Sequence, residues 1–562
     1  MSLFTDLDAA EVCLERANAA LDVAAQTLAQ AAAKDGRISV SLLDERQIDA
    51  FRFTNLLSEL RAAQAITTFA RRDGGRLSAG MATAFVAEML RELSSELGPR
   101  GAAWGLDREA LAATIEAPQV RAFMTQGLDG AHWEALGELV AEQGTGDAGL
   151  DGERKLIQRE FRRFAEQRVM PVAERVHRHD ELIPLDIIQG VSDMGCFGLS
   201  IPESYGGLQP DDAPDNLGMV LVTEELSRGS LGVAGSLITR PEILSKALLK
   251  GGTEAQKQRW LPLMATGERL CAVAVTEPDF GSNVAGMKVT ATPVDGGYLL
   301  NGQKTWCTFG GYADLIMVLA RTDPDPKAGH RGLSILLAEK PRFEGHAFEH
   351  VQRPGQGGVP AGRGGGKMTG KAIDTIGYRG MHSFDIWFED YFVPADQLIG
   401  EEAGLGRGFY YQMEGFAGGR LQTAARAIGV MQAAFERALT YAQERKVFAK
   451  PIADYQLTKW KLARMATIIA TARQFTYQTA ALLDRGEGQM EASMVKLWAS
   501  RVAEWVAREA MQIHGGMGYA EEYDVSRYYL DARVFSIFEG AEEVLALRVV
   551  ARQVLTAALA AA

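Results

Sequence analysis

Residues 275–283 read VTEPDFGSN and residues 301–311 read NGQKTWCTFGG, and these two stretches decide how the rest of the chain is interpreted. Both combine β-branched or aromatic residues with Gly, Pro, Asn or Asp, which is typical of strands that end in turns. In the first stretch, hydroxyls and free backbone N–H groups can hydrogen-bond a polar ring edge or a pyrophosphate. In the second, Trp306 and Thr308 share one face of the predicted strand, which suits a flat heterocycle. A single Trp at such a position is more often a core residue.

Outward from these stretches, short strand-like runs continue from residue 270 to about 395, and helical periodicity dominates on both sides. The stretch GTGDAGLDG at 144–152 has the composition of a linker. We therefore predict a mainly α protein with a central β domain (α+β). The expected parts are an N-terminal helical extension (1–150, here the front block), a helical domain (151–269), a β domain (270–395) and a C-terminal helical bundle (396–562).

The composition excludes several classes of protein. The 562 residues carry a net charge of −13, which argues against a broad nucleic-acid-binding face. The four cysteines have no metal-ligand spacing and fit a reducing compartment, so we expect no metal site and a cytoplasmic location. The start of the chain lacks signal-peptide character, and we identify no run of about 18 apolar residues in the sequence, so we predict no membrane insertion.

Two glycine-rich segments resemble phosphate-binding loops only superficially. GRGGGKMT at 362–369 has Ala361 in place of the first P-loop glycine and Met368 in place of the Ser or Thr that would ligate Mg²⁺. GLGRGF at 404–409 lacks the spacing of a dinucleotide fingerprint. We interpret both as flexible loops, and the run 355–370 as a long insertion between strands.

Two helical segments far apart in the chain resemble each other. Residues 47–68 align without gaps on residues 456–477, with Gln47 opposite Gln456 and Phe51 opposite Trp460. Two amphipathic helices can share such a pattern by chance. Alternatively, the front block imitates part of the C-terminal bundle.

The C-terminal part contains a candidate general base. Residues 533–544 read RVFSIFEGAEEV, which places Glu539 directly after Phe535, Ile537 and Phe538. A carboxylate among apolar residues suits proton abstraction. The competing interpretation is a carboxylate stabilised at a helix N-terminus.

Several motifs, in order, resemble the acyl-CoA dehydrogenase family over residues 153–555. They are LSIPESYGGL, GTEAQKQRWLP, VTEPDFGSN, NGQKTWCTFGG, IGYRGMHSFDIWFEDYFVP, YAQERKVFAKPIADYQ, QIHGGMGY and IFEG. The resemblance implies a helical domain, a β-barrel-like domain and a four-helix bundle that hold FAD. It also implies α,β-dehydrogenation of an acyl-CoA thioester, in which Glu539 removes the α-proton and hydride passes to flavin N5.

The resemblance assigns roles to individual residues. For FAD they are Val275, Thr276, Ser282, Trp306 and Thr308, with Arg445, Phe448, Gln456, Gln512, Gly515 and Gly516 reaching the FAD of a neighbouring subunit. Ser282 and Arg420 are also expected near the substrate. The chain departs from the family at Ala541, where Thr is usual, and in GFAGGR (415–420), which lacks the usual acids. Gly419 excludes the alternative base position, so Glu539 is the expected base.

The acyl tail is expected to be anionic. GSLITRPEIL (235–244) places Arg240 beside the position where relatives line the tail pocket with uncharged residues, and Arg379 and Arg228 are further candidates. A salt bridge from Arg240 to Glu242 is the alternative. An inward Arg240 requires a carboxylate partner, which indicates a dicarboxylyl-CoA. The front block, the Gly-rich insert and the TRPEIL segment resemble those of family members that act on a short branched dicarboxylyl-CoA, and this resemblance implies methylsuccinyl-CoA, oxidised to mesaconyl-CoA in the ethylmalonyl-CoA pathway, as the specific substrate.

The expected assembly is a homodimer, because a front block that imitates a bundle can cover the surface through which relatives form tetramers. An electron-transferring flavoprotein is the expected electron acceptor. The alternatives are a dehydrogenase for short monocarboxylic thioesters, an acyl-CoA oxidase, and a DNA-associated relative that no longer dehydrogenates.

Overall fold

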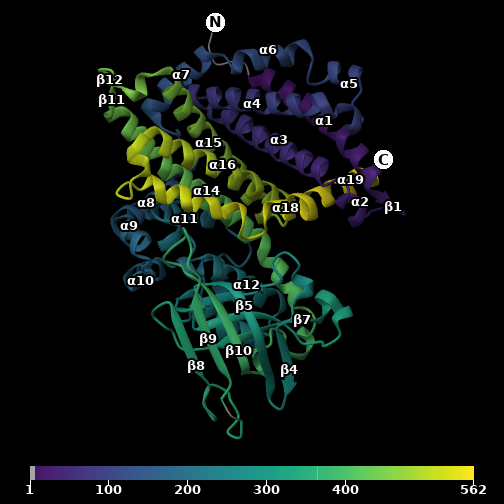
Figure 1. The fold of residues 1–562 in the computed structure, drawn as a ribbon, viewed down its shortest axis with the longest axis vertical. Helices are drawn as coiled ribbons and strands as arrows, with labels where there is room; N and C mark the ends of the chain where they lie inside the picture. The colour runs from purple at the N-terminus through teal and green to yellow at the C-terminus, as the bar shows by residue number, and fades with distance from the viewer. Residues whose placement is uncertain (1–6, 364, 562) are drawn as a thin grey trace. The chain divides into compact units, whose positions relative to one another are not determined.

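The computed structural model describes residues 7–363 and 365–561, which form two compact units. We call Met1–Leu156 together with Thr423–Ala562 the bundle unit, and Ile157–Gln422 the sheet unit. Figure 1 shows helices throughout the bundle unit, and a sheet flanked by helices in the sheet unit. This arrangement confirms the predicted α+β class.

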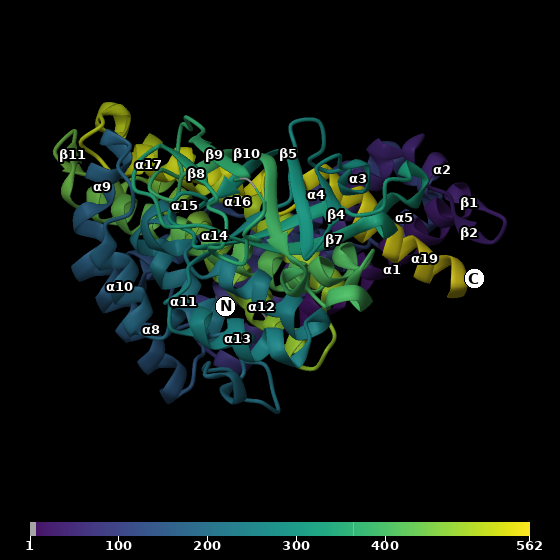
Figure 2. The ribbon, with the colours of Figure 1, turned by 90° about the horizontal axis from the view of Figure 1, so that it is seen from below.

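The sheet unit begins with helices and continues into an eight-stranded sheet. Its helices are α8 (Gly152–Phe164, shared with the bundle unit), α9 (Met170–His179), α10 (Leu185–Asp193), α11 (Asn216–Gly229), α12 (Thr239–Gly251) and α13 (Glu254–Ala265). Its strands are β3 (Cys271–Ala274), β4 (Thr290–Val294), β5 (Gly297–Thr308), β6 (Leu315–Arg321), β7 (Leu333–Glu339), β8 (Ala347–Val351), β9 (Lys367–Ala372) and β10 (Ser383–Pro394). The strand order is β3-β6-β4-β5-β10-β9-β8, with β7 paired to β6. Figure 2 shows β4, β5, β10 and β9 running together.

Strand β6 explains why this part of the sequence lacks polar alternation. Ile316 and Val318 pack with Phe384 in one apolar cluster, whereas Met317 packs in another cluster with Trp260 of α13. Both faces of β6 are therefore buried, and a strand buried on both faces is continuously apolar. Helix α13 begins with a capping box in which Thr253 and Gln256 satisfy each other's backbone N–H groups.

The glycine-rich run 355–370 is not wholly the flexible insertion that we expected. Residues 367–370 belong to β9, which pairs with both β8 and β10. Gly370 lies against the ring of Phe348, where a Cβ atom would come within 2.1 Å of ring carbon. Some of the glycines therefore serve close packing within the sheet, which composition alone could not distinguish from loop flexibility.

The bundle unit combines the front block with the C-terminal helices. The front block contains α1 (Leu7–Ala32), β1 (Ala33–Lys34), β2 (Arg37–Ile38), α2 (Val40–Asp44), α3 (Gln47–Asp73), α4 (Arg76–Arg100), α5 (Arg108–Ala113), α6 (Pro118–Gly127) and α7 (Gly130–Gln143). The C-terminal part contains α14 (Gly408–Glu444, entering from the sheet unit), β11 (Lys446–Val447), β12 (Lys450–Pro451), α15 (Gln456–Asp484), α16 (Gln489–His514), α17 (Val525–Arg533), α18 (Glu542–Val544) and α19 (Arg552–Ala561).

Helices α3 and α15, the two segments with similar sequences, begin at the aligned residues Gln47 and Gln456 and pack against each other. Helix α4 also contacts α15, and Arg464 of α15 donates to both carboxylate oxygens of Glu88 of α4 at 2.9 Å. Phe85 packs edge-on against Trp498 of α16. The front block thus shares a core with the C-terminal bundle (Figure 1).

Contrary to the sequence expectation, one segment of the described residues is long and apolar enough to cross a membrane by length and composition. It is Glu542–Ala561, which has a mean hydropathy of 1.6 over its most apolar window. Its residues Leu545, Val550 and Leu555 are buried, and it contacts α1 and α3 of the front block. Core helices of soluble proteins meet the same criterion, but only 28% of this window is buried.

Candidate active site

In the sheet unit, a buried lysine fixes the loop 275–283. The Lys304 ammonium donates to the Val275 carbonyl at 2.8 Å and to Glu277 Oε1 at 2.9 Å, and its side chain is fully buried. The Glu277 carboxylate also accepts the backbone N–H groups of Lys288 and Val289. Burial lowers the pKa of Lys304 to about 8, because desolvation disfavours the charged ammonium.

This clamp brings the two motifs of the sequence side by side. The Thr305 N–H donates to the Thr276 carbonyl at 2.8 Å, so Thr276 lies beside the end of β5. Val275 and Thr276 are half-buried, and Ser282 is exposed. Lys304 was missed as a site residue. Strand alternation gave no signal for it, since that pattern places Lys304 on the same exposed face as Trp306, whereas Lys304 is fully buried and the left-handed backbone at Trp306 interrupts the alternation.

Trp306 is exposed on a strained backbone. Its φ is +57°, and 54% of the residue is exposed. A bulky residue rarely adopts the left-handed conformation, which costs about 1–3 kcal/mol. Cys307 is fully buried, and the Thr308 hydroxyl lies 2.9 Å from Ser383 Oγ. Trp306 is therefore not the core residue that a single Trp usually is, and its exposed plane near Thr276 fits a flat aromatic ring.

Arg240 is buried in α12 without a carboxylate partner among the described residues. It is 7% exposed, and its guanidinium donates to the Ser236 carbonyl at 2.8 Å and to the Tyr378 hydroxyl at 3.2 Å. The Glu242 carboxylate instead contacts the amide of Gln422. The alternative salt bridge with Glu242 is therefore not formed. Tyr378 was missed by the sequence interpretation because it lies 138 residues from its partner.

The other candidate arginines in the sheet unit already have partners. Arg228 pairs with Glu166 at 2.9 Å. Arg379 donates to the His177 carbonyl at 2.9 Å and lies 3.3 Å from Asp180. Arg420 lies over the ring of Phe416. Arg240 is therefore the best candidate to receive an additional anion.

The glycines of GFAGGR allow close packing of α14 on α12. A Cβ atom at Gly418 would come within 2.2 Å of Glu242 Oε1, and one at Gly415 would lie 3.2 Å from Ile243 Cα. Ala417 is buried in the same stretch. A larger residue at Gly418 would require the Glu242 side chain to move, and one at Gly415 would press on the backbone of the helix that carries Arg240.

In the bundle unit, Glu539 also has a left-handed backbone. Its φ is +53°, the residue is half-buried, and Gly540 follows with φ +96°. The Lys496 ammonium donates to the Gly540 carbonyl at 2.6 Å and anchors the turn. Strain of this kind persists only where surrounding contacts enforce it, and it concentrates at functional sites. The nearby Glu542 is also half-buried, and burial raises its pKa.

Six residues of the bundle unit were expected to reach the FAD of a neighbouring subunit, and all six are exposed to solvent. They are Arg445, Phe448, Gln456, Gln512, Gly515 and Gly516. Phe448 is 92% exposed, with φ +49°. Gln456 lies 3.4 Å from Glu134 of the front block. An exposed aromatic residue beside exposed amides is suited to contacts outside its own chain.

Comparison with known proteins decides the family. Family models for the N-terminal, middle and C-terminal domains of acyl-CoA dehydrogenases match residues 151–268, 272–364 and 406–555. The chain belongs to the acyl-CoA dehydrogenase family. It is 38% identical to (2S)-methylsuccinyl-CoA dehydrogenase of Cereibacter sphaeroides, over 98% of each chain. It is also 36% identical to the Caffeyl-CoA reductase-Etf complex subunit CarC of Acetobacterium woodii, over 70% of this chain and 96% of that protein.

Among solved structures, the glutaryl-coenzyme A dehydrogenase glutaryl-CoA complex is similar, with a TM-score of 0.64 and 29% identity over 72% of this chain and 96% of that one. Acyl-CoA dehydrogenases are FAD-dependent oxidoreductases, and this chain is one of them. The exposed plane of Trp306 and the hydroxyls of Thr276 and Thr308 fit the flavin ring. The front block lies outside the three family models, but the match to the Cereibacter protein includes it.

Proposed function

We propose that the chain dehydrogenates a short branched dicarboxylyl-CoA, methylsuccinyl-CoA, to mesaconyl-CoA. The observation that carries this proposal is Arg240, a buried guanidinium without a carboxylate partner among the described residues. A substrate carboxylate would neutralise it, and the Tyr378 hydroxyl would hold the guanidinium in place. The 38% identity to a methylsuccinyl-CoA dehydrogenase, which extends through the front block, supports the same substrate.

In this proposal, the residues named above have separate roles. Glu539 removes the α-proton of the thioester, and its backbone N–H donates to the thioester oxygen as negative charge develops there. FAD supplies the acceptor for the hydride that leaves the β-carbon. Thr276, Trp306 and Thr308 hold the ring, while Arg240 holds the far carboxylate and so fixes which carbons react. Ser282 and Arg420 contact the phosphate-bearing parts of FAD and CoA.

The proposed electron acceptor is an electron-transferring flavoprotein rather than oxygen. Support comes from the relative named as a subunit of a reductase-Etf complex. Turnover of methylsuccinyl-CoA with this acceptor should yield mesaconyl-CoA by chromatography and mass spectrometry. Turnover with butyryl-CoA alone would contradict the dicarboxylate substrate, and equal rates with oxygen as the only acceptor would favour an oxidase.

The proposed assembly is a homodimer in the cytoplasm. The front block covers parts of α15 and α16 with α3 and α4, so this surface of the bundle is occupied within one chain. The exposed Phe448 and Gln512 provide the surface for one neighbouring copy. All four cysteines are free, which suits a reducing compartment. A mass of about 120 kDa is expected from light scattering of a chain of 60.9 kDa, and a tetrameric mass would contradict the proposal.

A further inference from the structure

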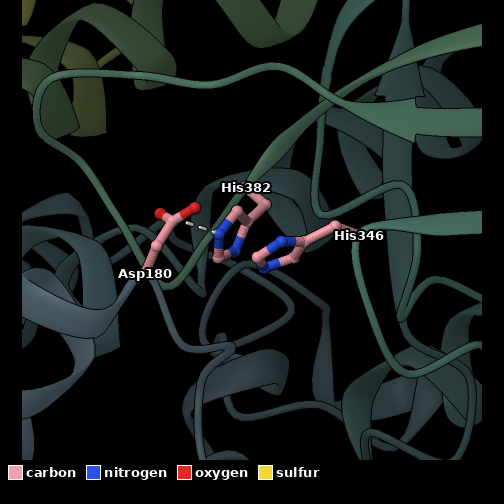
Figure 3. Close-up of side chains that lie close together, drawn as sticks. All are labelled: Asp180, His346 and His382. Carbon is pink, nitrogen blue, oxygen red and sulfur yellow. Dashed lines mark hydrogen bonds and ion pairs between the residues drawn. The ribbon is translucent and has the colours of Figure 1, made fainter.

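Three residues from distant segments of the sheet unit converge outside the groups assigned above. Asp180 directly follows α9, His346 directly precedes β8, and His382 directly precedes β10. One ligand-type atom from each, a carboxylate oxygen or a ring nitrogen, lies within 4.8 Å of the other two. Figure 3 shows the His382 ring between Asp180 and His346.

The contacts of His382 indicate which of its two ring nitrogens carries the hydrogen. Nδ1 lies 3.1 Å from the Gly380 carbonyl oxygen, and Nε2 lies 3.2 Å from Asp180 Oδ1. A carbonyl oxygen only accepts, so Nδ1 carries the hydrogen. In the neutral ring, Nε2 then turns a lone pair toward a carboxylate oxygen. Two acceptors at this distance repel unless a proton or a metal cation lies between them.

This arrangement is that of a metal-binding histidine. Metal-ligating histidines usually donate their second ring N–H to a carbonyl or carboxylate, which orients the ligating nitrogen. Ligands at about 2.0–2.1 Å in a tetrahedral zinc site lie roughly 3.3–3.4 Å apart, close to the observed separation of His382 and Asp180. His382 is buried, with 3% of its side chain exposed, which limits its ability to rotate away.

His346 is the third residue of the group, and it is exposed. Its ring centroid lies 4.5 Å from that of His382, at 37° between the planes. Two imidazoles and one carboxylate form a ligand set suited to Zn²⁺ and similar divalent ions, with a fourth position open to water. The Arg379 guanidinium, 3.3 Å from Asp180 Oδ1, reduces the attraction for a cation, so we expect an exchangeable site.

We propose that Asp180, His346 and His382 bind a divalent transition-metal ion of the zinc class. The ion would join the end of α9 to the starts of β8 and β10. It would thereby stiffen the segment that runs from Tyr378, the partner of Arg240, to His382. Sequence analysis predicted no metal site, because the three ligands lie on segments separated by 166 and 36 positions and form no local spacing pattern.

The test is calorimetric titration of the tag-free, FAD-loaded enzyme with ZnCl₂ after treatment with a chelator. Wild type should bind one Zn²⁺ per chain and unfold at a higher temperature with Zn²⁺ present. His346→Asn, a change at an exposed residue, should weaken Zn²⁺ binding by at least about tenfold. Loss of a residue that only supports a metal ligand already weakens metal binding by about this much. His179→Asn, a change at an exposed histidine next to Asp180, is the matched control and should bind as wild type does.

Two results would overturn the proposal. If wild type binds no zinc, the His382–Asp180 contact is an imidazolium–carboxylate pair held by a proton. If His346→Asn and His382→Asn both bind Zn²⁺ as tightly as wild type, the metal lies elsewhere. Flavin absorbance of each variant verifies that the fold and the FAD site are intact, so neither result depends on a misfolded protein.

Discussion

Replacing Arg240 with Met tests the proposed substrate class. Arg240 is 7% exposed, and the partners of its guanidinium among the described residues are both uncharged, at 2.8 and 3.2 Å. Met has a similar length and no charge. In the variant, the substrate carboxylate would be buried without a partner, which costs about 3–5 kcal/mol. The value of kcat/KM for methylsuccinyl-CoA should therefore fall by about 150-fold to 5,000-fold.

The same substitution should have little effect on the free enzyme. Removing a buried charge that lacks a counter-ion relieves a desolvation cost, which offsets the two lost hydrogen bonds. The free energy of unfolding should therefore fall by no more than about 1 kcal/mol. A purely structural arginine would show the opposite result, with a large loss of stability and no change in selectivity.

The assay is steady-state turnover of methylsuccinyl-CoA and butyryl-CoA by wild type, Arg240→Met and Arg228→Met. Arg228 is equally buried but pairs with Glu166, so its variant should not change the ratio of the two kcat/KM values. Arg240→Met should change this ratio in favour of butyryl-CoA. An equal loss for both thioesters would refute the argument that Arg240 binds a carboxylate.

Three further changes test other parts of the account. Glu539→Gln should lower kcat by about 10²–10⁴-fold and leave the amount of bound flavin unchanged, since an amide cannot accept the α-proton. Flavin reduction at the wild-type rate in stopped-flow measurements would exclude Glu539 as the base. Trp306→Gly should reduce the retention of FAD on gel filtration, and unchanged FAD affinity would contradict the stacking role. The same change should raise the stability of the FAD-free protein, because glycine adopts the left-handed conformation at φ +57° without strain. The pKa of Lys304 is about 8 in the folded protein and 10.5 in the unfolded chain. Between these pH values the unfolded chain binds more protons than the folded protein. The free energy of unfolding should therefore rise with pH across this window, by up to about 3 kcal/mol. The double variant Lys304→Met/Glu277→Gln should lose this slope in urea unfolding, and an unchanged slope would assign it to other groups.

The sequence predicted the fold class and the strand that carries Trp306 and Thr308, because both depend on local periodicity. Strand alternation places Cys307 inward and its neighbours outward, and the structure has this pattern. The two segments aligned from Gln47 and Gln456 were also interpreted as helices, and they lie in α3 and α15. Such local patterns can be recognised in the sequence without knowing which distant segments of the chain are in contact.

Features that depend on distant segments could not be predicted from the sequence. The 355–370 run was predicted as loop, because glycine composition does not distinguish flexibility from the close approach of Gly370 to Phe348. The partner of Arg240 was missed, since Tyr378 comes from another segment of the chain. The Lys304–Glu277 clamp and the Asp180–His382 contact are also tertiary. No local rule specifies such contacts.

Anaerobic titration of the purified holoenzyme with methylsuccinyl-CoA, succinyl-CoA and butyryl-CoA, followed by flavin absorbance, tests the central claim most directly. Bleaching requires that a thioester bind and lose a proton and a hydride, and it needs no external acceptor. The account predicts rapid, complete bleaching by methylsuccinyl-CoA and little or none by butyryl-CoA. Bleaching by butyryl-CoA alone would contradict the anionic-tail site, and no bleaching by any of the three would contradict the proposed substrate.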